Sequence, residues 1–175
     1  MNRSRVVDAG VSAGAILAVG ALAAGWYGID RAVPTPMTPV TDRPVELDSG
    51  PGPGVSFRAP LGWERVPSGQ ADILRFTHPN GSSLTVRLTT GMTDFSTAAP
   101  RRLRELEVGG VDATFTGDLR GPQFAGRTCT ASAGERRGQC AVVGRSDLLV
   151  TVLTLHTGDG PLADVPALVQ TLRES

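Results

Sequence analysis

Few residues in this sequence could carry chemistry. The two cysteines, Cys129 and Cys140, lie eleven positions apart, and His78 and His156 are the only histidines. The polar run at 133–138 predicts a hairpin turn that places the two cysteines opposite each other on paired strands, close enough for a disulfide. A redox or metal-binding pair is the alternative, but a thiolate metal site needs further ligands, and only the two histidines are left. We therefore predict a structural disulfide, no metal and no cofactor.

No catalytic motif is present. The sequence contains no G-x-S-x-G, no H-E-x-x-H and no phosphate-binding loop, so we do not expect an enzyme. The candidate ligand-binding residues are Trp63, which could cover a groove, and an arginine cluster that could bind an anion. Core packing of the tryptophan and a solvated helix surface are the alternatives. The cluster comprises Arg101, Arg102 and Arg104.

The charge balance argues against a nucleic-acid partner. The chain has 175 residues, 17 basic and 17 acidic side chains, and all of its basic residues are arginines. From residue 55 onward, 13 arginines face 12 acidic residues. A domain so close to neutral lacks the basic surface that phosphate backbones require.

Residues 11–29 form an uncharged apolar run. A helix of this length rises roughly 28 Å, which matches the hydrocarbon core of a bilayer. Arg3 and Arg5 precede the run and predict a cytoplasmic tail at 1–10, with the C-terminal portion outside. Cleavage of a signal peptide after Ala23 is the alternative. Gly10 and Gly14 are spaced for a helix-mediated dimer, although small residues are also common in membrane helices.

The elements beyond the membrane segment divide into a stalk and a domain. Six of the thirteen prolines fall in the segment 30–54, which predicts an extended spacer. Residues 55–175 alternate in short β-like runs, and two stretches have helical periodicity. We expect an α+β domain with an antiparallel sheet of about six or seven strands, packed by helices at 93–107 and after 158. The β-like runs that could supply these strands lie at 55–59, 63–66, 73–77, 83–89, 111–115, 124–131, 139–143 and 148–155.

A family resemblance starts from Pro60-Leu61-Gly62-Trp63, which ends the strand at 55–59. This motif, followed by strand, hairpin, helix, strands and helix, resembles the PsbP-like fold as it occurs in actinobacterial envelope lipoproteins of the LpqN type. The likeness spans roughly residues 54–174 and implies a non-enzymatic adaptor or binding module. The chain differs from those lipoproteins because it has a membrane segment and no lipidated cysteine.

Together these features predict a single-pass protein of the cell membrane whose C-terminal domain lies outside the cytoplasm. We expect an interaction module of the cell envelope that contacts lipid through its N-terminal helix and binds a protein partner, such as a membrane or secretion assembly. The alternative is a carrier or sensor of a small apolar or anionic envelope ligand.

Overall fold

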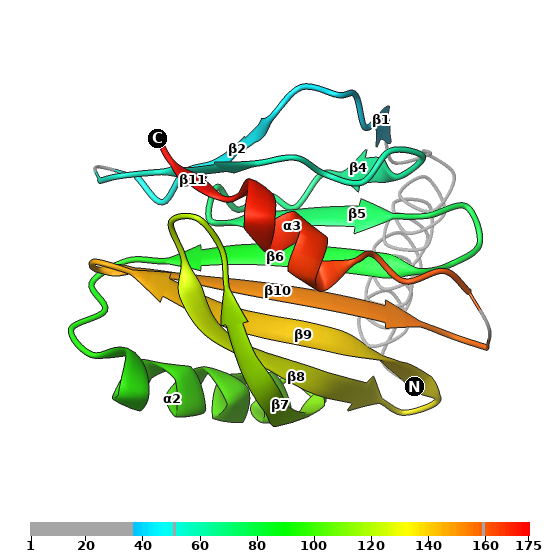
Figure 1. Cartoon of the computed structure of the whole chain (residues 1–175). Helices are drawn as coiled ribbons and strands as arrows, with labels where there is room; N and C mark the ends of the chain where they lie inside the picture. The colour runs from blue at the N-terminus through cyan, green and yellow to red at the C-terminus, as the bar shows by residue number, and fades with distance from the viewer. Residues whose placement is uncertain (1–36, 51, 159) are drawn as a thin grey trace, which may run out of the picture. The chain divides into compact units, whose positions relative to one another are not determined.

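The computed structural model describes residues 37–50, 52–158 and 160–175 (Figure 1). The predicted cytoplasmic tail, the membrane segment at 11–29, the Gly10 and Gly14 pair, and the cleavage position after Ala23 lie outside these residues. Within the described part, no helix combines the length and apolar character needed to cross a membrane.

An eight-stranded sheet dominates the described part of the chain, and every neighbouring pair of strands is antiparallel. The predicted α+β class with an antiparallel sheet is therefore confirmed, with more strands than the six or seven expected. In spatial order the strands are β1 (Thr38–Pro39), β4 (Glu64–Val66), β5 (Ile73–Thr77), β6 (Ser83–Thr89), β10 (Leu148–His156), β9 (Arg136–Arg145), β8 (Ala125–Ala133) and β7 (Asp112–Arg120).

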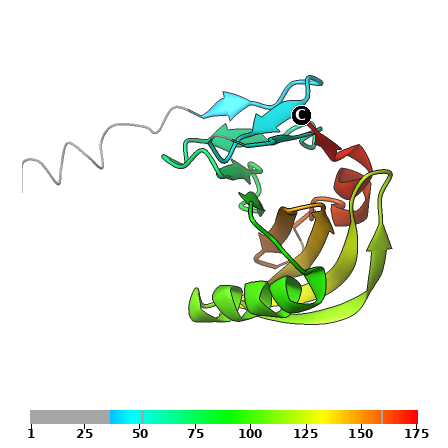
Figure 2. The same cartoon turned by 90° about the vertical axis from the view of Figure 1, so that its left-hand side faces the viewer.

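A second, smaller sheet and two helices complete the described fold. The sheet contains β11 (Arg173–Glu174), β3 (Val55–Phe57) and β2 (Val45–Leu47), in that order. Helix α3 (Val165–Thr171) shares the main core with this sheet, whereas α2 (Phe95–Val108) packs on the other face of the large sheet. Figure 2 shows how strongly the large sheet curves between these two layers.

Alternation along the strands explains the two layers. On β6, Leu84, Val86 and Leu88 are fully buried while their neighbours are half-buried or exposed, as the period-two pattern predicts. On β9, Val143 belongs to the main core with α3, and Val142 belongs to a separate cluster under α2. The central strands are thus apolar on both faces because each face is covered by other elements.

The predicted stalk at 30–54 is wrong for part of the segment 37–54, which is folded into the domain. Residues 45–47 pair with β3, and Leu47 is only 1% exposed in the main core. Pro39 ends β1, an edge strand, where the missing amide of proline costs no hydrogen bond inside the sheet. The folded domain therefore begins before residue 55, because proline-rich chain can pair at an edge while its few apolar side chains are buried.

The final helix also begins later than expected. The turn residues at 158–161 predicted its start, but α3 begins at Val165. The Asp164 carboxylate accepts a hydrogen bond of 2.9 Å from the amide of Ala167, which caps the helix. Pro166 lies in the first turn, where its missing amide leaves no helical hydrogen bond unmade.

Candidate functional site

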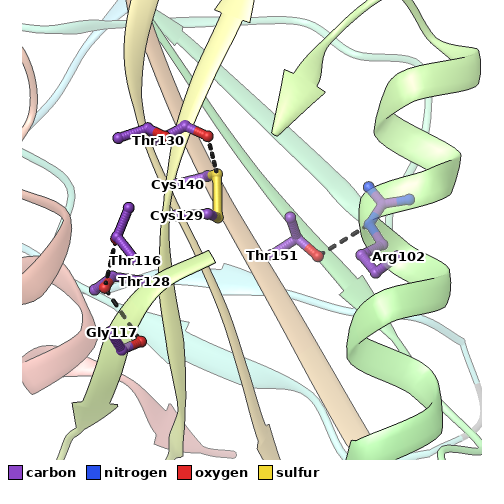
Figure 3. Close-up of a disulfide and its surroundings, with 8 residues drawn as sticks. All are labelled: Arg102, Thr116, Gly117, Thr128, Cys129, Thr130, Cys140 and Thr151. Carbon is purple, nitrogen blue, oxygen red and sulfur yellow. Dashed lines mark hydrogen bonds between the residues drawn. A yellow bond between two sulfur atoms is a disulfide. The ribbon is translucent and has the colours of Figure 1, made fainter. Parts of the chain in front are cut away.

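The cysteines form the predicted disulfide, which joins β8 to β9 (Figure 3). Cys129 and Cys140 are direct cross-strand partners, with 4.8 Å between their Cα atoms. Both are buried beside Ala131 and Leu155 in a small apolar cluster on the α2 side of the sheet. Closing a loop of this size stabilises a fold by about 3 kcal/mol in the chain-entropy account. The bond is structural, and neither cysteine offers a thiol.

Trp63 lies in the main core and is 5% exposed. Its indole and the His78 ring pack in an edge-to-face arrangement, with 5.5 Å between the ring centroids. The imidazole Nδ1 of His78 lies 2.7 Å from the side-chain oxygen of Asn80. The observed contacts of the indole are therefore with protein, and its proposed part in ligand binding stays a prediction.

Two of the three clustered arginines line one cavity. Arg101 and Arg102 border a space of about 280 Å³ between α2 and the ends of β6 and β10. Arg104 is exposed and is not part of this lining. The remaining walls are Thr89, Thr90, Gly91, Met92, Ala98, Glu105 and Leu149. We call this space the α2 cavity.

Arg102 points at the sheet instead of into solvent. Its Nε donates to the Thr151 hydroxyl at 3.0 Å (Figure 3), and its Nη1 donates to the Glu105 carboxylate at 2.7 Å. The Arg102 side chain is 9% exposed, whereas Glu105 is 48% exposed. A buried guanidinium needs such partners, because an unpaired charge away from water is costly. Arg102 thereby links α2 to β10.

Glu105 is shared between the two arginines of the cavity. Its other oxygen lies 3.5 Å from Nε of Arg101, a side chain that is 78% exposed. The hydrogen bond from Arg102 lowers the pKa of Glu105 below its ordinary value, against the opposing effect of desolvation. The carboxylate is therefore ionised at neutral pH, and this group of three side chains carries one net positive charge.

A larger groove of about 650 Å³ adjoins the α2 cavity at the start of α2. Met92 lines both spaces, and Phe95, Gly126 and Gly144 border the groove. Its charged side chains are partly committed to other contacts. Arg127 lies 4.3 Å from the centroid of the Phe115 ring, and other charged lining residues are Asp94, Asp118, Arg120 and Arg145.

Thr151, Gly126 and Gly144 were not among the site residues predicted from the sequence. The two threonines in the mostly apolar run 148–155, Thr151 and Thr154, were a usable signal, because a buried hydroxyl needs a partner. Gly144 gave no such signal, since its role depends on how close α2 comes to the sheet. A Cβ at this position would lie 2.8 Å from atoms of both Met92 and Phe95.

The described residues contain no group of three or more His, Cys, Asp or Glu side chains arranged to hold a metal ion. Around the α2 cavity they bring together a guanidinium pair, hydroxyls and apolar side chains. No protein-family model and no curated protein matches this chain.

Proposed function

We propose that the chain is a membrane-anchored, extracytoplasmic interaction module of the cell envelope, without enzymatic activity. The observation that carries this proposal is the disulfide between β8 and β9. Disulfides persist in oxidising compartments and are rare in the cytosol. The uncharged run at 11–29, with Arg3 and Arg5 before it, supplies a route across the membrane that fits this location.

The proposed module acts through its folded surface. The outer edge of the large sheet supports this role, because β7 ends the sheet and pairs only with β8 among the described strands. Along its nine residues, a bulge lies between Phe115 and Gly117, and the Arg120 carbonyl accepts a hydrogen bond from Gln170. The rest of this edge can accept an extended segment of a partner protein. We include two further features in this proposal. The domain is related to PsbP-like envelope domains, and the chain dimerises through Gly10 and Gly14.

Two measurements on the full chain test the location and the partner. A reporter that works only outside the cytoplasm, fused after Ser175, is expected to be active. Alkylation of intact cells before lysis is expected to leave Cys129 and Cys140 unmodified. An inactive reporter together with alkylated cysteines would contradict export. Affinity capture from solubilised membranes, with the membrane segment alone as control, is expected to yield an envelope protein held by the domain.

A second function, a carrier or sensor of a small envelope ligand, is favoured by one observation. The α2 cavity brings Arg101 and Arg102 together against apolar walls. Such convergence of a few polar groups in a concave apolar site is typical of ligand pockets, although this cavity lies just below the usual size of about 300–1,000 Å³.

A further inference from the structure

We propose that the α2 cavity binds a carboxylate with a short apolar chain, and that Glu105 is a built-in competitor for the same arginines. The inference rests on the second candidate function, because it names the ligand class of that cavity. Three features carry it: the unused donors of Arg102, the excess positive charge, and the apolar walls.

Arg102 has donors to spare. A guanidinium carries five N–H groups, and the structure uses one Nε–H for Thr151 and one Nη1–H for Glu105. Arg102 lines the cavity, and within the described residues its other N–H groups make no hydrogen bond. Hydrogen bonds from a buried guanidinium to a carboxylate are about twice as strong as neutral ones. The cavity therefore contains a fixed, charged donor.

The second arginine can adapt to a ligand. Arg101 borders the same cavity, and its contact with Glu105 is long, at 3.5 Å. Because Glu105 is half-exposed and bound to both arginines, it occupies the kind of contacts that an incoming carboxylate needs. Two arginines and one glutamate leave one positive charge without a partner inside this group. An anion that enters the cavity supplies that partner.

The walls select the rest of the ligand. Met92, Ala98 and Leu149 line the cavity, and Leu149 is 4% exposed. An apolar chain gains by contact with such walls, and a flexible methionine adapts to its shape. The volume of about 280 Å³ corresponds to about nine water-sized groups, at about 30 Å³ each. A carboxylate of about six carbons fits this space, whereas inorganic phosphate has no part that uses the apolar walls.

Hexanoate is the probe, and the full chain in nanodiscs of zwitterionic lipid is the sample, with empty nanodiscs as the blank. Calorimetric titration is expected to show binding to the wild type and severalfold tighter binding to Glu105→Gln, because the competing charge is removed while a hydrogen-bond acceptor for Arg102 remains. Arg101→Gln is expected to bind hexanoate about tenfold more weakly than the wild type does, because it loses a charge-assisted hydrogen bond.

The matched control is Arg104→Gln, on the same helix but outside the cavity, which is expected to bind like the wild type. The Glu105→Gln variant separates ligand binding from a purely structural ion pair, which gives no reason for a gain in affinity. Weaker or unchanged binding by Glu105→Gln, or no binding by either protein at millimolar hexanoate, overturns the proposal. Equal binding of hexanol overturns the carboxylate class and still supports a carrier. The export and capture assays do not depend on this result.

Discussion

Asp94 shows how strongly one side chain can define the start of a helix. Its carboxylate accepts hydrogen bonds from the hydroxyls of Ser96 and Thr97, at 2.6 and 2.7 Å, and from the backbone amides of both residues. These bonds, with that from the Ser96 hydroxyl the strongest cause, lower the pKa of Asp94 from 3.8 to about 2. Because the charged form is favoured in the folded state, folding and the ionisation of Asp94 are linked.

The linkage predicts a pH window for this helix cap. The folded pKa lies below the unfolded one, so the stabilisation is fully present above about pH 4 and is lost as the pH falls towards about 2. In Asp94→Asn the cap remains but does not titrate. We expect the melting temperature of the wild type to fall more steeply between pH 4 and 2 than that of Asp94→Asn, as measured by thermal denaturation across this range.

A second variant tests whether the hydroxyls of Ser96 and Thr97 cause the lowered pKa of Asp94. Replacing Ser96 and Thr97 together by alanine removes both hydroxyl donors, so the pKa of Asp94 should move back towards its ordinary value. The acid-dependent loss of stability should then become smaller than in the wild type. Identical pH profiles for the wild type, Asp94→Asn and the double variant would show that the cap does not control this transition.

Single positions differ in how well the sequence predicts them. The disulfide followed from simple counting, because two cysteines equally far from a hairpin centre must face each other. The first long helix was expected to begin at residue 93, and in the structure Asp94 caps it. The inward direction of Arg102 was not predictable, since it depends on the rotation of α2 against β10 and on the partner Thr151.

The contact between α2 and the large sheet depends on a position without a side chain. Gly144 on β9 lies under Met92, which precedes α2, and under Phe95, the first residue of α2. Any Cβ at this position would come within 2.8 Å of both side chains. Methionine can rotate away, but the phenylalanine ring is half-buried and packs with the cluster under α2. The close approach of helix and sheet thus requires glycine.

We predict that Gly144→Ala destabilises the fold by about 1–3 kcal/mol, the usual cost of overpacking a tight contact. Chemical denaturation followed by circular dichroism measures this change. Gly52→Ala is the matched control, because a Cβ there meets nothing within 4 Å and the backbone is not in the left-handed region. Equal stability of the two variants would show that the helix moves at no cost.

Helices and strands could be predicted where a short stretch of sequence carries the whole pattern of apolar and polar residues. The hairpin of β5 and β6 and the helix at 95–108 match the expected ranges closely, because alternation and helical periodicity are visible in sequence. The start of α3 was misplaced, since Gly158 to Pro161 and Asp164 both give start signals and only the structure shows which one caps the helix.

The boundary of the whole folded unit is the largest difference between sequence and structure. Proline content predicted a free stalk up to residue 54, yet strands at 38–39 and 45–47 already pair with strands of the domain. Val45 and Leu47 alternate across Glu46 and bring apolar side chains onto the core from the edge of the small sheet. Three residues are too short a run for periodicity to outweigh the prolines around them, so the pairing with β3 could not be foreseen.

A buried leucine in β2 tests whether this segment belongs to the folded domain. Leu47→Ala in the full chain should reduce the free energy of unfolding by about 2–5 kcal/mol, as for other buried leucines, because the side chain is 1% exposed in the main core. Leu61→Ala is the control: it removes the same atoms from a side chain that is 67% exposed and should be nearly neutral. Denaturation of the chain in nanodiscs measures both. A free stalk would make the two substitutions equally mild, whereas a large gap between them shows that the segment before residue 55 is part of the domain that any partner meets.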